Sequence, residues 1–121
     1  MNRIVTAKDV VPPGQRAVVV FTRGGKLIFD KKGEGSTGNW KVSLSKMEKV
    51  DKVVIYLREA RQNGGNILMG DYVGYEPSPE QGRYIFLFSH LNEAGFTKSN
   101  WFEFGGVNQN PVSFLNYLLI T

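Results

Sequence analysis

The sequence KVVIYLREARQNGGNILMGDYVGY, residues 52–75, decides the fold. It holds two apolar runs, VVIYL at 53–57 and NILMGDYVGY at 66–75, which the breaker Asn63-Gly64-Gly65 separates. Branched and aromatic side chains are typical of β-strands, and Asn-Gly-Gly is typical of a turn. We therefore predict a strand on each side of the turn. Because the first run is continuously apolar, we expect it in the core.

The run at 66–75 presents different side chains on its two faces, because successive residues of a strand point to opposite sides. One face would carry Ile67, Met69, Asp71, Val73 and Tyr75, and the other Leu68, Gly70, Tyr72 and Gly74. Two glycines on one face indicate a bend, or a neighbour packed close against the backbone. After a turn at 76–82, the run RYIFLFS at 83–89 is apolar on both faces and predicts a central strand.

The residues before this region predict a hairpin, a loop and a short helix. AVVVFT at 17–22 and KLIF at 26–29 flank Gly24-Gly25, which predicts a hairpin of two strands. Residues 30–39 are polar and glycine-rich, so we expect an exposed loop there. Across 42–50 the apolar residues recur at helical spacing, and Ser45 precedes Glu48 by the capping-box offset, which predicts a helix of two turns.

The residues after 89 predict a loop at 92–100, a short aromatic strand at 101–104 and a C-terminal helix. Asn110-Pro111 is an N-cap followed by proline at the first helical position, and apolar residues then recur at helical spacing through 119. Strands and helices do not alternate as a doubly wound sheet requires. We therefore expect the α+β class, as one domain over 1–121: a small mixed or antiparallel β pseudo-barrel with two or three short flanking helices.

The composition excludes several classes of protein. The chain has 121 residues, one His and no Cys, so disulfides, thiolate zinc sites and cysteine nucleophiles are absent. No stretch approaches the ~20 apolar residues that span a bilayer, and the N-terminus lacks the pattern of a signal peptide. We expect a cytoplasmic protein without a membrane partner.

The charge is concentrated in the first half of the chain. Residues 1–61 hold 13 Lys or Arg and 6 Asp or Glu, a net charge of +7, whereas residues 62–121 hold 2 and 5, a net charge of −3. Backbone phosphates are the polyanion that a basic patch most often meets, so this asymmetry suggests nucleic acid, DNA or RNA, as the partner. The alternative is that the charge serves only solubility.

Motifs for catalysis and cofactors are weak. Gly33, Gly35 and Gly38 match G-x-G-x-x-G, but the next helix signal comes several residues later and no βαβ unit surrounds the motif, so we expect no dinucleotide and no other cofactor. The sole histidine, His90, has no second His or Cys beside it in the sequence, and a metal site is not expected. An isolated histidine at a strand end is more often a structural hydrogen-bonding residue.

The order Asn39-Trp40, Ser43, a short helix, DKVVIY at 51–56 and GNILMGDYVG at 65–74 resembles the PUA-like superfamily, particularly its EVE, YTH and ASCH branches. In those domains a Trp opens a helix, a strand written G-D-x-V-x-x-Y follows, and a strand of the type G-I-x-G-x-x-x-V comes next. Here Val50-Asp51 stands where the family has Gly-Asp. The resemblance covers residues 39–75 and implies a pseudo-barrel with flanking helices and a pocket at one side.

In the EVE and YTH branches this pocket accepts a flipped or unpaired modified base. Carried over position by position, the resemblance implies Trp40 as the pocket wall, Asn39 and Ser43 as polar neighbours and Tyr56 on the strand that forms the floor. Outside the matched stretch, Trp101 is our candidate for a second wall. The expected phosphate contacts are Lys31, Lys32, Lys41 and Arg58. For either tryptophan, the alternative is a place in the hydrophobic core.

The sequence thus predicts a non-catalytic nucleic-acid-binding domain that reads a flipped or unpaired, modified base in an aromatic pocket. Two other functions stay open. The first is a small protein-interaction module, such as a phage or defence-system protein, with the aromatic segment 101–104 as an anchor. The second is a nuclease-like enzyme that depends on His90 and scattered carboxylates.

Overall fold

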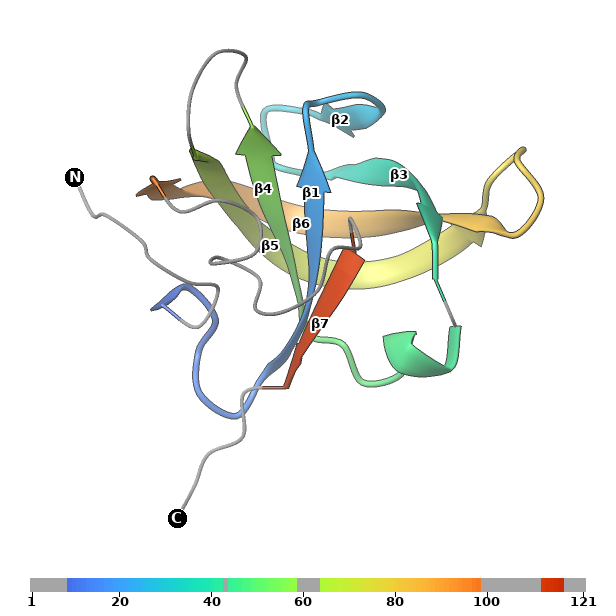
Figure 1. Ribbon diagram of the computed structural model, residues 1–121, viewed down its shortest axis with the longest axis horizontal. Helices are drawn as coiled ribbons and strands as arrows, with labels where there is room; N and C mark the ends of the chain where they lie inside the picture. Colours follow the sequence, from blue (N-terminus) through green and yellow to red (C-terminus); the bar gives the residue numbers. More distant parts are fainter. Residues whose placement is uncertain (1–8, 43, 59–63, 99–111, 117–121) are drawn as a thin grey trace.

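The computed structural model describes residues 9–42, 44–58 and 64–98, and the backbone of 112–116 (Figure 1). These residues form one mixed sheet of seven strands in the order β2-β3-β6-β5-β4-β1-β7. The strands are β1 (Arg16–Thr22), β2 (Leu27–Phe29), β3 (Gly35–Lys41), β4 (Lys52–Arg58), β5 (Gly65–Pro77), β6 (Arg83–Thr97) and β7 (Val112–Asn116). A single 3-10 turn, η2 (Leu44–Met47), connects β3 to β4.

The expected α+β class with flanking helices is wrong, because the described residues contain no α-helix. Residues 42–50 have helical spacing but form only the single turn of η2. A segment this short does not form a stable helix by itself, because the first turn of a helix is costly to form. Of the expected C-terminal helix, residues 112–116 form β7, and the remainder lies outside the described residues. Nowhere in the described part of the chain is there a helix with the length and hydrophobicity that crossing a bilayer requires.

The predicted hairpin of 17–22 with 26–29 is also wrong, because β1 and β2 lie at different places in the sheet. β1 pairs in parallel with β4 and antiparallel with β7, whereas β2 pairs with β3 at the far edge. Every residue of β1 from Ala17 to Thr22 is buried. A strand that is buried on both faces is more stable with a neighbour on each side, so β1 occupies an inner position. The chain then forms β2 and β3 at the far edge of the sheet before β4 pairs with β1.

Five strand predictions are confirmed, and two loop predictions are partly wrong. The runs at 17–22 and 26–29 coincide with β1 and β2 to within a residue at each end. The runs at 53–57, 66–75 and 83–89 lie in β4, β5 and β6. The expected loop at 30–39 is a loop only up to Glu34, because β3 begins at Gly35. The expected loop at 92–100 is strand through Thr97, as β6 continues there along β5. The aromatic segment 101–104 lies outside the described residues.

Two glycines of the G-x-G-x-x-G match, Gly33 and Gly35, stand where two backbones approach closely. A Cβ at Gly33 would lie 2.5 Å from the Leu91 amide nitrogen, and one at Gly35 would lie 1.9 Å from the Ile28 carbonyl oxygen. Any larger residue would force these segments apart. Glycine is therefore explained at both positions by packing.

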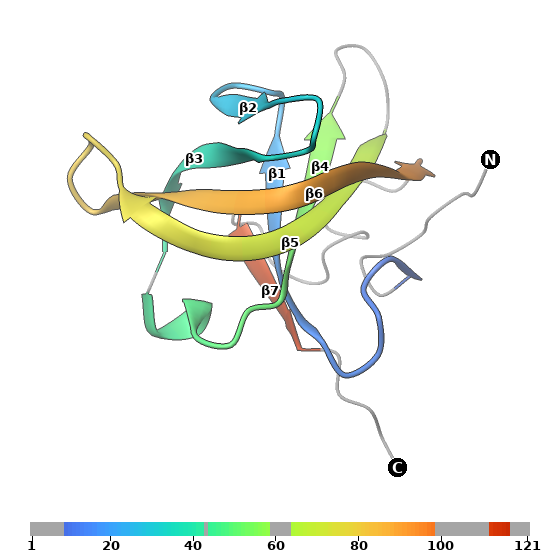
Figure 2. The same cartoon turned by 180° about the vertical axis from the view of Figure 1, so that it is seen from behind.

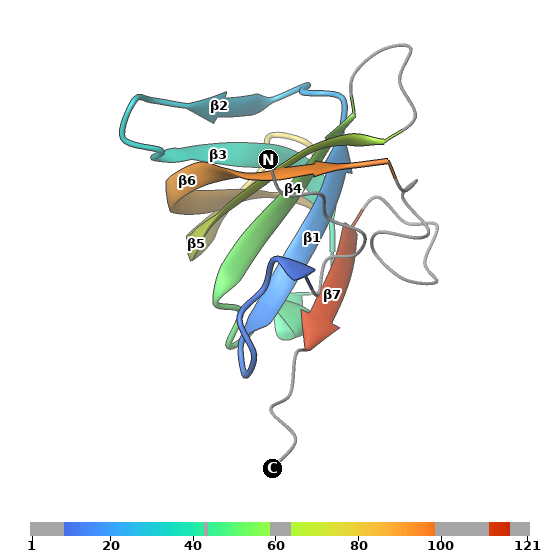
Figure 3. The ribbon, with the colours of Figure 1, turned by 90° about the vertical axis from the view of Figure 1, so that its left-hand side faces the viewer.

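The sheet curls, and its two faces bury different clusters. β5 curves from the direction of β4 into that of β3 (Figures 1 and 2), and a side view shows β2 and β3 running across β1 and β7 (Figure 3). The cluster that we call the inner cluster joins residues of β1 and β3, which β6, β5 and β4 separate in the sheet, so it lies on the concave side. Its members are Val18, Val20, Trp40, Met47, Val50, Val53, Ile55, Leu68, Phe86, Phe88 and Leu91. The outer cluster, on the opposite face, contains Val11, Ala17, Val19, Phe21, Val54, Tyr56 and Ile67.

Three register shifts between β5 and β6 accompany the curl. They fall between Ile67 and Leu68, between Met69 and Asp71, and between Tyr72 and Gly74. An extra residue in one strand of a pair bends that strand and increases its twist. The expected close packing at Gly70 is confirmed, since a Cβ there would lie 2.8 Å from the Ser89 carbonyl oxygen.

Candidate functional site

An open cleft of about 670 Å³ lies between η2 and the second half of β5. Its volume is within the range of about 300–1,000 Å³ that is usual for small-molecule sites. Apolar side chains and the tyrosines provide most of its wall, and a hydroxyl and a carboxylate provide the polar part. The lining residues are Leu44, Ser45, Met47, Glu48, Tyr72, Gly74 and Tyr75.

A bulge in β5 brings both tyrosines into this cleft. Tyr72 pairs with Phe88 and Tyr75 pairs with Phe86, so β5 advances by three residues while β6 advances by two. The extra residue is Val73, which is 62% exposed. Opposed residues of an antiparallel pair share a face, and Phe86 and Phe88 both belong to the inner cluster. Strict alternation predicted Tyr75 and Tyr72 on opposite faces of the strand, and that prediction is wrong because of the bulge.

Contacts with the inner cluster hold the tyrosine rings. Tyr72 packs edge-on against Phe86, with ring centroids 6.5 Å apart, and Tyr75 packs edge-on against Tyr84 at 5.6 Å. On the opposite wall, Met47 is buried in the inner cluster, which fixes η2 against the sheet. The Tyr72 amide donates to the Asp51 carbonyl oxygen at 3.0 Å, so the segment after η2 is tied to β5. The cleft is thus built on packed elements.

The cleft offers aromatic faces together with polar groups of both signs. Tyr75 is 45% exposed and presents its ring to solvent. Burial raises the pKa of the Tyr72 hydroxyl, and the neighbouring Tyr75 adds to this shift, so Tyr72 remains a neutral donor and acceptor at physiological pH. Glu48 lines the cleft and is exposed, and Lys46 and Lys49 of the same segment are exposed as well. The site can therefore stack a flat ring and hydrogen-bond its edge.

Trp40 and Tyr56, the predicted wall and floor of a base pocket, do not face one another. Trp40 is 9% exposed and belongs to the inner cluster, where its indole Nε1 donates to the Thr37 hydroxyl at 3.2 Å. Tyr56 is 1% exposed and belongs to the outer cluster, with its ring centroid 5.6 Å from that of Phe21. The sheet separates the two rings, so both occupy core positions in this structure.

The remaining predicted ligand contacts are only partly described. Asn39 is half-buried in β3, and its carbonyl oxygen accepts a hydrogen bond of 3.2 Å from Arg83 Nη1. Ser43 and Trp101 lie outside the described residues.

The four predicted phosphate contacts lie at three separate places. Lys31 and Lys32 are in the turn between β2 and β3, and Lys41 is at the opposite end of β3, paired with Arg83 on β6. Arg58 ends β4. Only Lys41 therefore lies at the η2 end of the molecule (Figures 1 and 2).

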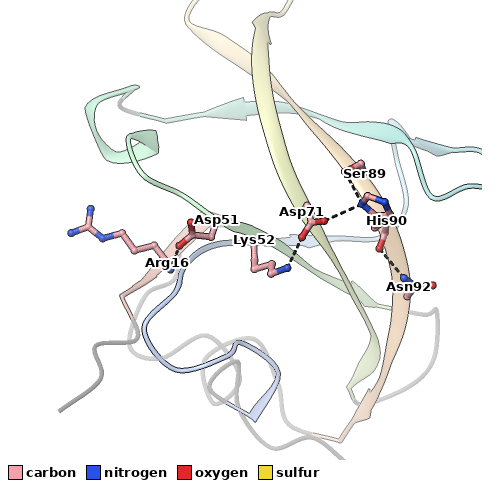
Figure 4. Close-up of polar contacts among 7 residues, drawn as sticks. All are labelled: Arg16, Asp51, Lys52, Asp71, Ser89, His90 and Asn92. Carbon is pink, nitrogen blue, oxygen red and sulfur yellow. Dashed lines mark hydrogen bonds and ion pairs between the residues drawn. The ribbon is translucent and has the colours of Figure 1, made fainter. Parts of the chain in front are cut away.

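A polar cluster lies on the outer face, across β4, β5 and β6 (Figure 4). Asp71 is central: one carboxylate oxygen contacts Lys52 Nζ, and the other lies 3.0 Å from His90 Nδ1. The hydrogen bond from Lys52 lowers the pKa of the Asp71 carboxyl below its ordinary value of 3.8, partial burial opposes this shift, and His90 adds to the lowering. Beside it, the Arg16 amide donates to the Asp51 carboxylate at 2.9 Å.

This arrangement differs from a catalytic triad. The Ser89 hydroxyl lies 3.1 Å from His90 Nδ1, the same ring nitrogen that faces Asp71. In a triad the nucleophile and the carboxylate contact different nitrogens, so that the ring can relay a proton between them. His90 has a positive φ of 55°, and Asn92 Nδ2 donates to its carbonyl oxygen at 2.8 Å. These contacts fit a structural role at the register shift in β6. The described residues also contain no group of three His, Cys, Asp or Glu side chains that could bind a metal.

Sequence reasoning missed the cleft although it noticed its components. The alternation of a regular strand assigns Tyr72 and Tyr75 to opposite faces, and the spacing at 42–50 predicts a helix where the structure has a 3-10 turn. The signal that could have joined them is Gly74 between two tyrosines, because glycine inside a strand often marks a bulge.

Comparison of the chain with protein-family models, with curated proteins and with solved structures finds no match. The resemblance of residues 39–75 to the PUA-like superfamily therefore stays a prediction.

Proposed function

We propose that this protein binds single-stranded nucleic acid, or an unpaired base within a longer strand, in the cleft between η2 and β5. The observation that carries this proposal is the open cleft with Tyr72 and Tyr75 on one wall. A base stacked on an aromatic side chain gains about 1–3 kcal/mol, whichever base it is. Tyr75 supplies an exposed ring, and its contact with Tyr84 limits the freedom that the ring loses on binding.

The charges around the cleft suit a nucleic-acid strand that enters at the η2 end. Lys46 and Lys49 lie on either side of Glu48 in the sequence. Lys41 and Arg83 are opposite one another in the ladder of β3 with β6, at the nearby ends of these strands. All four cations are exposed. Lysine and arginine attract phosphates without reading sequence, whereas an ionised carboxylate such as Glu48 accepts from the amino group of cytosine. We therefore propose that the cations attract the phosphates of the nucleic acid and that the cleft determines which base is preferred.

Fluorescence anisotropy with labelled single-stranded oligocytidine, oligothymidine and methylated oligocytidine, in DNA and RNA forms, tests the proposal. Tyr75→Ala should weaken binding by about 1–3 kcal/mol, because the stacking face is lost. Tyr75→Phe keeps the ring and should bind like the native protein.

Val73→Ala is the matched control, since Val73 is the exposed neighbour that lies outside the cleft lining. Equal affinity of the native protein and Tyr75→Ala would contradict the proposal. So would the absence of saturable binding below about 1 mM, which corresponds to only about 4 kcal/mol of binding free energy.

A further inference from the structure

The edge strand β2 is apolar and exposed on both faces. Within the described residues β2 has one strand neighbour, β3, and its other side forms the edge of the sheet. Ile28 is 68% exposed and Phe29 is 49% exposed. Successive strand residues point to opposite faces, so an apolar side chain stands on each side of the strand. Edge strands usually avoid this arrangement, because exposed apolar edges pair with other chains.

Positive charge surrounds this strand. The segment between β1 and β3, residues 23–34, contains four cationic side chains, Arg23, Lys26, Lys31 and Lys32, and two carboxylates, those of Asp30 and Glu34, a net charge of +2. The Asp30 Oδ1 atom already accepts hydrogen bonds from the amides of Lys32 and Glu34, at 2.9 and 3.0 Å. The Asp30 carboxylate is therefore engaged inside the turn, whereas the four cations and the Glu34 carboxylate are exposed, with cations at both ends of β2.

The hairpin that presents β2 is held in place. Besides the two bonds to the Asp30 side chain, the Gly33 amide donates to the Asp30 carbonyl oxygen at 3.0 Å, and the Leu91 amide donates to the Gly33 carbonyl oxygen at 3.0 Å. Gly33 also packs directly on the backbone of Leu91. These contacts join the tip of the hairpin to β6. A preorganised strand loses less conformational entropy when another chain pairs with it.

We propose that β2 binds an extended acidic segment of a partner protein, which adds to the sheet as a further strand. Backbone hydrogen bonds along β2 would provide affinity, as in other cases of strand addition. Ile28 and Phe29 would pack against alternate side chains of the segment, and the cations would pair with acidic residues that flank it. The surface lies at the opposite end of the molecule from η2, so it is separate from the proposed nucleic-acid cleft (Figures 1 and 2).

Charge argues against a second copy of this chain as the occupant. Pairing of two β2 strands would bring two segments of net charge +2 together, and like charges placed opposite one another across an interface repel. An acidic segment converts the same charges into attraction.

The test uses the labelled peptide EEVTVTVEE with the full chain, followed by fluorescence anisotropy at low and physiological salt. Two control peptides accompany it: KKVTVTVKK reverses the charge, and EEVTPTVEE has a central proline that removes a backbone donor from the ladder. We expect saturable binding of the first peptide alone.

Two sets of variants locate the binding. The double variant Ile28→Thr with Phe29→Thr keeps β-forming residues but removes the apolar faces, and should weaken binding by about tenfold or more. Lys31→Glu with Lys32→Glu should weaken it by a similar factor through charge alone. Val73→Thr changes an exposed valine elsewhere and should have no effect.

Four results would overturn the proposal. These are equal binding of EEVTVTVEE by all variants, equal binding of the proline peptide, no saturation up to about 1 mM peptide, and dimerisation in sedimentation experiments that the threonine variants abolish. The last result would assign β2 to a second copy.

Discussion

Trp40 shows how a large polar-tipped side chain is accommodated inside a small sheet protein. Its ring packs among aliphatic and aromatic members of the inner cluster, and its one donor is bonded to the buried hydroxyl of Thr37. A buried indole needs such a partner, because an unpaired N–H away from water is costly. The Trp40 position thus contributes to stability, whereas the exposed ring of Tyr75 is available for a ligand.

We expect Trp40→Ala to destabilise the fold by about 3–5 kcal/mol, since it leaves a cavity in the inner cluster. Urea denaturation followed by circular dichroism measures this loss. Trp40→Phe, which retains most of the apolar volume, should cost less. A Trp40→Ala variant with native stability would show that the ring does not fill the core.

At Asp71, the structure predicts a stability change in acid. Its pKa is lower in the folded protein, so the carboxylate stabilises the fold at pH values above its unfolded pKa. This contribution is lost as the pH falls through the folded pKa, below 3.8. Because Asp71 is 44% exposed and Lys52 is 22% exposed, the contribution should be under about 1 kcal/mol.

Urea denaturation of the native protein and of Asp71→Asn, near pH 7 and near pH 2, checks this. The variant should be slightly less stable than the native protein at the higher pH and equal to it at the lower one. A difference that persists or grows in acid would contradict the sign.

At the scale of elements, the burial of a strand decides its place in the sheet. β1 is buried along nearly its whole length and has a neighbour on each side. β2 has three residues, two of them exposed, and lies at the edge. The runs AVVVFT and KLIF are both apolar, so their local patterns gave them similar strand signals. Their different roles depend on which surface each one meets.

Hydrogen exchange should therefore rank the strands. Backbone amides of β1 and β4 should exchange slowest, because opening them requires disruption of both clusters. Amides of β2 should exchange much faster. Slow exchange within 112–116 would follow from pairing of β7 with β1. Equal protection of β2 and β1 would contradict the edge position of β2.

For the whole molecule, the curl of the sheet separates two candidate binding surfaces. Residues of η2 and β5 line the cleft, and β2 lies at the end of the molecule opposite η2 (Figure 2). At physiological ionic strength charges are screened over about 8 Å, so a charge change at one surface should have little effect on the other. The uneven charge of the chain therefore supports two separate proposals.

Each binding activity should be impaired by one variant and spared by the other. Lys31→Glu with Lys32→Glu should weaken binding of the acidic peptide and leave oligonucleotide affinity near the native value at physiological salt. Tyr75→Ala should do the reverse. Anisotropy with both probes on both variants measures this, and parallel loss of both affinities in either variant would show that one shared surface binds both.

The sequence by itself determined where β4, β5 and the first half of β6 lie, because continuous runs of branched and aromatic residues between breakers are a local property. It also located the turn after β5 and the absence of thiol chemistry. Local patterns could not show which strands pair with one another, or which face of the sheet a residue occupies after a register shift. The pairing of β1 with β4 and β7, the strand at 112–116 and the register shift at Val73 depend on hydrogen bonds between residues far apart in the chain.

Tertiary structure alone decided the candidate site. Trp40 and Tyr56 are close in sequence order and similar in chemistry, yet the sheet places them in different clusters. Tyr75 reaches the cleft because one extra residue reverses the face of every later residue in a strand. Local patterns specify which residues prefer burial. The face on which each residue is buried depends on the register between strands, which only the folded sheet sets.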